Sequence, residues 1–174
     1  MSENSTDSTE SKPSVYLGLG SNLDNPPQQL LEGIQLIMSH FKVDDIEVSS
    51  IYKTPPMGGK NQPDYYNLVC RFLSRKNPLE ILNMIQSIED KQGRIRTEHW
   101  GSRTLDIDIL LVGDTVSLMK DLQIPHPGIP ERNFVLGPLL EITPDLLDPL
   151  NQIPYQKYWD ELSPEAQQSL VKVK

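Results

Sequence analysis

The hydrophobic pattern at the start of the chain predicts a buried strand followed by an amphipathic helix. Residues 15–20 (Val-Tyr-Leu-Gly-Leu-Gly) are an apolar run that ends in glycine, which is typical of a buried strand leading into a turn. Four apolar residues then recur at helical spacing: Leu30, Ile34, Ile37 and Phe41. Because Pro26 and Pro27 follow Asp24 and Asn25, we expect a cap residue and then proline in the first helical turn.

The next segment predicts two strands joined by a long loop. Four residues alternate with more polar neighbours and favour one continuous second strand: Ile46, Val48, Ser50 and Tyr52. A third strand is expected over residues 65–73. The connection between these strands is rich in proline and glycine, and a loop of this length is often functional.

A second helix and a fourth strand follow. Asn77-Pro78-Leu79-Glu80 has the form of a capping box with proline at the first helical position. Leu82, Ile85 and Ile88 supply the apolar stripe, and residues 91–93 have the character of a helix end. Residues 104–112 (Thr-Leu-Asp-Ile-Asp-Ile-Leu-Leu-Val) are the strongest strand pattern in the chain.

The element order strand, helix, strand, strand, helix, strand predicts the α+β class. It is the order of the ferredoxin-like βαββαβ arrangement with an antiparallel sheet. A helical segment near residues 137–142 and a weak helix or arm in the last twenty residues predict C-terminal helical additions. We expect a disordered polar tail over residues 1–13, one domain over 14–162, and a C-terminal arm over 163–174.

Composition and charge narrow the possible functions. Sixteen basic and 24 acidic residues give a net charge of −8, which argues against general binding to nucleic acid or anionic membranes. The single cysteine, Cys70, excludes an internal disulfide framework and a multi-cysteine zinc site. Because the chain lacks an apolar run of membrane-spanning length and its first residues do not resemble a signal peptide, we expect a cytoplasmic protein.

Asp106 and Asp108 are candidate metal ligands. On a strand, residues two apart point to the same face, while Leu105, Ile107 and Ile109 face the core. Two carboxylates held together repel each other and favour a bound cation. Oxygen ligands without histidine or cysteine suit Mg²⁺, which usually brings substrate phosphates. The alternative is a solvent-facing edge strand whose outer positions are acidic.

A basic segment directly precedes this pair of aspartates. Residues 91–103 carry four basic side chains and one acidic side chain, including Arg94, Arg96 and Arg103. Arginine forks suit phosphate oxygens, and glycines around a lone Trp100 suggest a loop that closes over a ligand. A solvated turn is the alternative, but cationic and anionic groups side by side favour phosphoryl transfer.

Two further segments are candidates for lining a pocket. Gly18-Leu19-Gly20-Ser21-Asn22 fails as a dinucleotide fingerprint because Leu23 stands at the third glycine position, and the sequence has no Walker-type phosphate loop. The segments 54–57 and 62–67 could bind the edge of a flat heterocycle, or they could be an ordinary proline-rich connection. Among the histidines, His126 is the best functional candidate because prolines flank it.

Together these motifs closely resemble the 6-hydroxymethyl-7,8-dihydropterin pyrophosphokinase family. The likeness runs from about residue 15 to residue 147 and rests on these segments: Gly20-Ser21-Asn22, Thr54-Pro55-Pro56, Gln62-Pro63-Asp64-Tyr65 with Asn67, Glu89 with Gly93-Arg94, Trp100-Gly101, Arg103-Thr104-Leu105-Asp106-Ile107-Asp108, and Pro125-His126. The resemblance implies a folate-biosynthesis enzyme of ferredoxin-like fold. It would transfer pyrophosphate from ATP to the hydroxymethyl group of the pterin and release AMP.

The resemblance also implies roles for individual residues. Asp106 and Asp108 would hold two Mg²⁺ ions, and the implied catalytic residues are Arg94, Arg96, Arg103, Asp106 and Asp108. The implied pterin contacts are Gly20, Thr54, Pro55, Met57, Tyr65, Asn67, Trp100 and Phe134. The implied ATP contacts are Glu89, Arg96, Arg103, Ile109, His126 and Arg132. The resemblance leaves open which group, if any, acts as general base.

The alternative from another class is a catalytically idle ferredoxin-like module, such as a nucleotide sensor or an RNA binder. The net charge of −8 and the lack of a basic, aromatic strand pattern disfavour RNA. An idle relative would be expected to lose an aspartate of the pair, Arg103 or His126, yet all are present. We therefore expect a monomeric enzyme that binds ATP and the pterin, with no nucleic-acid or membrane partner.

Overall fold

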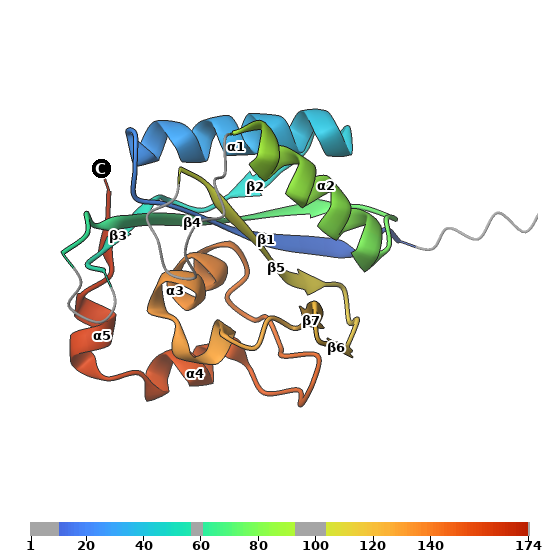
Figure 1. The fold of residues 1–174 in the computed structure, drawn as a ribbon. Coiled ribbons are helices and arrows are strands. Elements are labelled where there is room, and N and C mark those ends of the chain that lie inside the picture. The colour runs from blue at the N-terminus through green and yellow to red at the C-terminus, as the bar shows by residue number, and fades with distance from the viewer. Residues whose placement is uncertain (1–10, 57–60, 93–103, 174) are drawn as a thin grey trace, which may run out of the picture.

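The protein is an antiparallel sheet covered by helices on both faces (Figure 1). The computed structural model describes residues 11–56, 61–92 and 104–173. The main sheet has the order β5-β1-β4-β3-β8, and β2 pairs with β4 off this path. Its strands are β1 (Ser14–Ser21), β2 (Glu47–Val48), β3 (Tyr52–Thr54), β4 (Tyr65–Leu73), β5 (Asp106–Val112) and β8 (Val171–Lys172). The order β1, α1, β3, β4, α2, β5 confirms the predicted ferredoxin-like α+β class.

Helices α1 (Pro26–Phe41) and α2 (Pro78–Lys91) cover one face of the sheet (Figure 1). The apolar stripe of each helix packs on the strand residues that point to that side, including Leu17, Leu19 and Ile107. The capping box at the start of α2 is confirmed, because Asn77 Oδ1 accepts from Glu80 N and Glu80 Oε2 accepts from Asn77 N. Burial of these two stripes supplies the larger of the two cores.

Helices α3 (Asn133–Ile142) and α4 (Tyr155–Glu161) cover the opposite face (Figure 1). Tyr16, Val69 and Leu110 point to this side and form a second core with the apolar side chains of α3. A short helix α5 (Pro164–Gln168) precedes β8, and a separate hairpin joins β6 (Ser117–Met119) to β7 (Leu122–Ile124). A 3-10 turn (Ile129–Glu131) connects this hairpin to α3.

The predicted second strand is wrong as one continuous element. The structure divides it into β2 and β3, and the interruption covers residues 49–51 and begins at Ser49. Ser49 N donates to the carbonyl oxygen of Val69, while Ser49 Oγ accepts from Val69 N at 3.0 Å. Because the hydroxyl takes the place of a backbone acceptor, the strand ladder is interrupted there.

The start of α1 confirms the predicted order of a cap residue and then proline in the first turn, but the side chain of that cap residue does not cap the helix. Asn25 occupies the cap position, but it adopts a left-handed conformation with φ 60° and its side chain makes no capping hydrogen bond. Prolines 26 and 27 have no N–H groups for a side chain to cap. The first available donor is Gln28 N, which bonds to the carbonyl oxygen of Asn25 at 3.0 Å.

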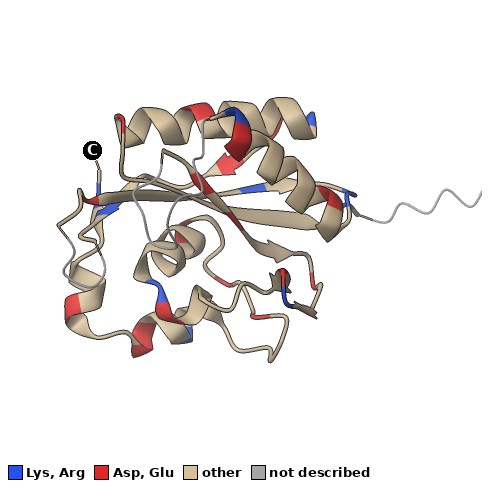
Figure 2. Cartoon of the chain, in the orientation of Figure 1, with Lys and Arg blue, Asp and Glu red and all other residues tan. Residues whose placement is uncertain are grey.

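The C-terminal region was predicted only in outline. The expected helix near residues 137–142 begins earlier, at Asn133, and contains Pro138. The β6–β7 hairpin was not predicted. The last residues fold as α5 and then as β8, which adds an edge strand to the main sheet. Acidic residues are spread over both helical layers, as the net charge of −8 leads one to expect (Figure 2).

Tyr155 gives a stability prediction. Its side chain is fully buried, its hydroxyl has no hydrogen-bond partner among the described residues, and burial raises its pKa. We expect Tyr155→Phe to leave the free energy of unfolding unchanged or to raise it by about 1 kcal/mol, because a desolvated hydroxyl is removed. Urea denaturation measures this difference.

Tyr158→Phe is the matched control on the same helix. The Tyr158 hydroxyl donates to Asp148 Oδ2 at 3.1 Å and accepts from Asn151 Nδ2 at 2.8 Å. Its removal is expected to lower the free energy of unfolding by about 1 kcal/mol. Equal destabilisation by the two substitutions would contradict the conclusion that the Tyr155 hydroxyl is buried without a hydrogen-bond partner among the described residues.

Candidate active site

Residues that are paired between neighbouring strands form a row across the main sheet. Gly20 on β1 is paired with Asp106 on β5 and with Asn67 on β4. Asn67 is paired in turn with Tyr52 on β3, and Tyr52 with Lys172 on β8. Neighbouring strands lie about 4.8 Å apart, so Asp106 and Asn67 are separated by about 10 Å.

Position 20 in this row needs a glycine, because the Asn67 side chain occupies the space that a Cβ atom would take. A Cβ atom at Gly20 would lie 2.7 Å from Asn67 Oδ1, so the amide of Asn67 lies over the Gly20 backbone. The Asn67 side chain is 8% exposed. The family resemblance implied both residues as pterin contacts, and the structure brings them together on the face covered by α3.

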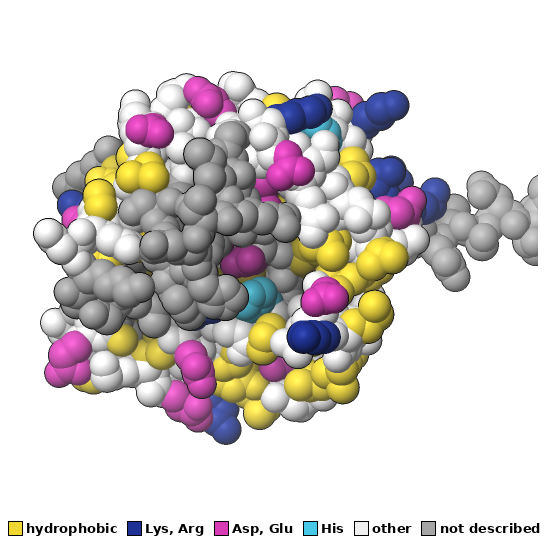
Figure 3. Space-filling view, viewed as in Figure 1, with side chains coloured by type: hydrophobic (Ala, Val, Ile, Leu, Met, Phe, Trp, Pro, Cys, Tyr) yellow, Lys and Arg dark blue, Asp and Glu magenta, His cyan; other side chains and the backbone are white. Residues whose placement is uncertain are grey.

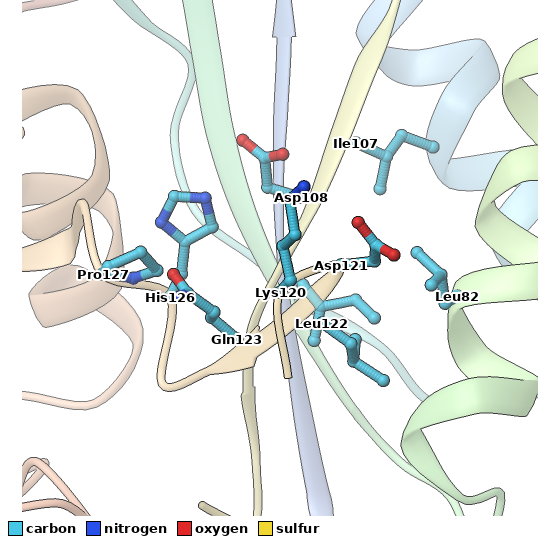
Figure 4. Close-up of a pocket in the computed structure, with 10 residues that line it drawn as sticks. Leu82, Ile107, Asp108, Lys120, Asp121, Leu122, Gln123, His126 and Pro127 are labelled. Atoms are coloured by element: carbon cyan, nitrogen blue, oxygen red, sulfur yellow. The ribbon is translucent and has the colours of Figure 1, made fainter. Parts of the chain in front are cut away.

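The two aspartates share that face, as the strand prediction required. Ile107 and Ile109 belong to the core beneath α1 and α2, so Asp106 and Asp108 point to the opposite side. Figure 4 shows Asp108 on the side of His126 and Ile107 on the side of α2. Strand β5 forms one edge of the main sheet, so these carboxylates lie near that edge.

Glu89 fixes the backbone between the two aspartates. Its carboxylate Oε1 accepts from Ile107 N at 2.9 Å, and its side chain, which comes from the last turn of α2, is 2% exposed. A buried carboxylate that accepts a hydrogen bond from a backbone N–H forms a strong, directional interaction. Glu89 therefore holds the strand segment that carries Asp106 and Asp108.

A cavity of about 240 Å³ lies beside Asp108 along the β5 edge. Its apolar walls come from Leu82, Ile107, Ile109, Leu122 and Pro127, and its polar lining comes from Asp108, Lys120, Asp121, Gln123 and His126 (Figure 4). In Figure 3, a histidine and an acidic side chain lie next to each other near the middle of this face, with apolar side chains toward the β6–β7 hairpin. Apolar walls with a polar rim suit a ring that carries charged groups.

His126 is held as a neutral donor at this cavity. Its Nδ1 accepts from Gly128 N at 3.0 Å, which leaves the hydrogen on Nε2. Burial and the positive charge of Arg132 lower the pKa of His126 to about 4. The negative charge of Asp106 acts in the opposite direction but is the smaller effect. Arg132 is close by, since a Cβ at Gly128 would lie 2.7 Å from its Nε.

This pKa shift gives a pH prediction for the protein without nucleotide or metal. The pKa of His126 in the folded protein lies below the unfolded value of 6.5. The stability that neutral His126 contributes is therefore fully present above pH 6.5 and is lost as the pH falls toward 4. Between pH 7.5 and pH 5, the free energy of unfolding of the wild type is expected to fall by about 1 kcal/mol more than that of His126→Asn, after allowance for solvent screening.

The asparagine variant is chosen because its Oδ1 can still accept from Gly128 N while the side chain does not titrate. Urea denaturation at the two pH values measures the difference between the proteins. Parallel loss of stability in wild type and His126→Asn would rule out His126 as the titrating group.

The remaining described candidates are on β3 and β4 and in the first turn of α3. Thr54 ends β3, is 6% exposed and is paired with Tyr65, while Pro55 follows it at the surface. The Tyr65 hydroxyl donates to Gln62 Oε1 at 3.1 Å. Phe134, in the first turn of α3, packs against the second core, and the Arg132 guanidinium lies 5.8 Å from its ring centre.

Some predicted site residues lie outside the described part of the chain: Met57, Arg94, Arg96, Trp100 and Arg103. The structure adds Leu82, Lys120, Asp121, Leu122, Gln123 and Pro127, which sequence reasoning did not assign to the site. Most of these come from or adjoin the β6–β7 hairpin. Ser117 to Ile124 carries only a short alternation without Gly or Asn at the turn, so it lacked a recognisable hairpin signal.

The donor set suits Mg²⁺ bound together with a substrate. Asp106 and Asp108 supply oxygen ligands on one face, and within the described residues no group of three His, Cys, Asp or Glu side chains could hold a metal by itself. Mg²⁺ usually takes one or two carboxylates and completes its octahedron with waters and phosphate oxygens. The pair therefore fits an ion that arrives with a polyphosphate.

The fold and the carboxylate pair suit an enzyme that binds a polyphosphate together with Mg²⁺. Comparison with known proteins specifies the class as an ATP-dependent diphosphotransferase. The family model for 7,8-dihydro-6-hydroxymethylpterin-pyrophosphokinase (HPPK) matches residues 16–144. The chain is 42% identical over 139 residues to the 2-amino-4-hydroxy-6-hydroxymethyldihydropteridine pyrophosphokinase of Haemophilus influenzae, covering 80% of this chain and 87% of that protein. It is 40% identical over 128 residues to the Bacillus subtilis enzyme of the same name, covering 74% and 77% of the two chains.

The fold comparison agrees with these matches. The crystal structure of Plasmodium falciparum HPPK-DHPS wild type with pteroate superposes with a TM-score of 0.69 at 16% identity. The match covers 86% of this chain and 42% of that longer chain. The chain belongs to the 7,8-dihydro-6-hydroxymethylpterin-pyrophosphokinase family. Its reaction is transfer of pyrophosphate from ATP to the hydroxymethyldihydropterin in folate biosynthesis.

Proposed function

We propose that the face of the sheet beneath α3 is the active site for this reaction, with ATP at the β5 edge and the pterin toward β3. The observation that supports this most is the register of Asp106, Gly20 and Asn67 across three adjacent strands. The carboxylate pair then lies between the cavity beside Asp108 and the segment that begins at Thr54. Two substrates bound on either side of the pair would meet at it.

On the nucleotide side, the cavity would hold the base and His126 would donate from Nε2 to a phosphate oxygen. Ile109 lines this cavity, and Arg132 supplies a cation beside His126. A neutral imidazole donor suits an anion that is already compensated by other charges. Arg96 and Arg103, which lie outside the described residues, are proposed as further phosphate contacts on the resemblance, with Arg94 as a catalytic residue of the same segment.

On the pterin side, Thr54, Pro55 and Asn67 would form hydrogen bonds to the ring edge. The Asn67 amide, placed over Gly20, offers a donor and an acceptor, which suits the paired donor and acceptor atoms of a pterin. Tyr65 and Phe134 are proposed to stack on the ring faces. Met57 and Trp100 remain proposed contacts from outside the described residues.

Asp106 and Asp108 are proposed to hold two Mg²⁺ ions when ATP is bound. The ions would neutralise the phosphate charge and orient the reacting oxygens. The chain itself contributes the positioning: Glu89 fixes the strand that carries the aspartates, and Asn67 fixes the angle at which the pterin approaches. Holding two substrates in line supplies much of the rate enhancement in such transfers.

The direct experiment is to incubate purified protein with ATP, Mg²⁺ and 6-hydroxymethyl-7,8-dihydropterin and to measure AMP. AMP release is expected to require both the metal and the pterin. Absence of AMP above background, or AMP formation that is independent of the pterin, would overturn the proposed assignment of the site. A catalytically idle module would bind the nucleotide equally well with and without the pterin.

The monomeric state and the cytoplasmic location are also proposals. The described helices include none with the length and apolar character of a membrane span. Cys70 is a free, buried thiol, which suits a reducing compartment. Size-exclusion chromatography with light scattering would test the monomer, for which a mass near 19.7 kDa is expected.

A further inference from the structure

The described part of the C-terminal arm, residues 163–173, docks on the start of α3. Asn133 Nδ2 donates to the carbonyl oxygen of Ala166 at 2.6 Å and to Ser169 Oγ at 2.9 Å. The Leu170 side chain lies against Gly137, where a Cβ atom would approach it more closely than van der Waals contact. The arm is therefore attached to the helix turn that carries Phe134, the residue next to Asn133.

The arm then crosses to the far edge of the sheet and pairs with β3. Lys172 is paired with Tyr52 and Val171 with Lys53, and Val173 N donates to the carbonyl oxygen of Ile51 at 2.9 Å. Strand β3 is three residues long and ends at Thr54. A strand this short has few backbone hydrogen bonds of its own, so pairing on its second side restricts it substantially.

Glu141, near the end of α3, ties the same elements together through one carboxylate. It accepts from Ser50 N at 3.2 Å, from Ser50 Oγ at 2.7 Å and from the Tyr52 hydroxyl at 2.7 Å. Lys172 Nζ lies 3.5 Å from the same carboxylate and 5.7 Å from the centre of the Tyr52 ring. Burial raises the pKa of Glu141, but the hydrogen bonds from Tyr52 and Ser50 and the charge of Lys172 outweigh it and lower the pKa.

Most of these contacts lie on the β3 side of the active site, although Asn133 is also next to Arg132, a proposed ATP contact. The arm and Glu141 contact β3, which ends at Thr54, and the helix that carries Phe134. The nucleotide cavity lies at the opposite edge of the sheet and is lined by residues of α2, β5 and the β6–β7 hairpin. Figure 1 shows the C-terminal end beside β3, with β6 and β7 on the other side of the molecule.

We propose that the C-terminal arm, together with Glu141, is a positioning element for the pterin subsite: it holds β3 and the start of α3, the two walls of that subsite, in the geometry that accepts the ring. The inference rests on the proposed function, because the walls are those assigned to pterin binding. Without the arm, β3 would move more freely, and the pterin would bind at an entropic cost that the wild type avoids. ATP binding would change much less, because Arg132 is the one proposed ATP contact among the described residues that adjoins the docking site of the arm.

The test uses a chain that ends at Ser169, so that Leu170 and all of β8 are removed. Its KM for the pterin is expected to rise roughly tenfold. Its kcat, and its affinity for an unreactive ATP analogue with Mg²⁺, are expected to stay within about twofold of wild type. Steady-state AMP release and calorimetry provide these values, and circular dichroism checks that the shortened chain is folded.

Glu141→Gln provides a second test in the full-length chain, should the shortened chain fail to fold. It removes the charge that binds Lys172, and its KM for the pterin is expected to rise about threefold. Glu47→Gln is the matched control. Glu47 is also an exposed carboxylate that accepts from a basic side chain on the same sheet, but that side chain, Arg71, belongs to β4 and not to β3 or β8.

The outcomes separate the two proposals. AMP release by the wild type tests the proposed function by itself. The positioning role of the arm is tested by the ratio of the pterin KM of each variant to that of the wild type. An unchanged pterin KM in both variants would overturn the positioning role. So would equal weakening of pterin and nucleotide binding, since a general loss of structure would affect both sides of the site.

Discussion

Replacing Asp108 by alanine is expected to reduce turnover about a thousandfold, which corresponds to about 4 kcal/mol of transition-state stabilisation. Asp108 shares its face of β5 with Asp106 and lines the cavity beside His126. One remaining carboxylate would hold Mg²⁺ and its phosphates poorly. The effect is expected in kcat, measured as AMP release at saturating substrates.

The fold is expected to survive the Asp108→Ala substitution. Removing one of two neighbouring carboxylates relieves their repulsion, so the thermal midpoint without metal should stay within about 3 °C of wild type. Asp114→Ala is the matched control, because Asp114 is an exposed aspartate just beyond the other end of β5. A variant of Asp108 that keeps more than about a tenth of wild-type turnover would show that the pair does not bind the catalytic metal.

Replacing Glu89 by alanine is expected to have the second largest effect, on stability and activity together. The Ile107 N–H would lose the acceptor that lies 2.9 Å away, in a region where the Glu89 side chain is 2% exposed. We expect the free energy of unfolding to fall by about 2–3 kcal/mol and turnover to fall by roughly tenfold to a hundredfold. Urea denaturation and AMP release measure the two effects.

Glu89→Gln distinguishes two roles for this residue. Glutamine keeps an oxygen that can accept from Ile107 N, so a positioning role predicts that most of the stability and turnover are retained. A role that depends on the charge near the nucleotide predicts a loss as large as that of alanine. Glu80→Ala on the same helix is the control: it removes the capping contact with Asn77 and should leave turnover unchanged.

Several elements could be predicted from the sequence because their local patterns agree with their tertiary contacts. The strand over residues 65–73 is β4, and the capped helix that begins at Pro78 is α2. The alternation of Asp106, Ile107 and Asp108 is enough to predict two carboxylates on one face, since the period of a strand allows no other arrangement.

Other features depended on contacts that local patterns do not contain. The second predicted strand is interrupted because Ser49 bonds to Val69, twenty residues further along the chain. The β6–β7 hairpin carries three polar residues of the cavity, yet it has the weak periodicity of a surface loop. Glu141 and Ser50 are 91 residues apart, and nothing in either segment indicates that they bond.

By itself, the sequence determined the fold class, the order of the main elements, the carboxylate pair and the family, because each follows from residue types at short, fixed spacing. Only the tertiary structure decided that Gly20 and Asn67 complete a row with Asp106, that the cavity lies along β5, and that the last strand pairs with β3. These are pairings between distant segments. Their partners are chosen by the packing of the whole chain, in which many registers compete and the most complete burial and hydrogen bonding prevails.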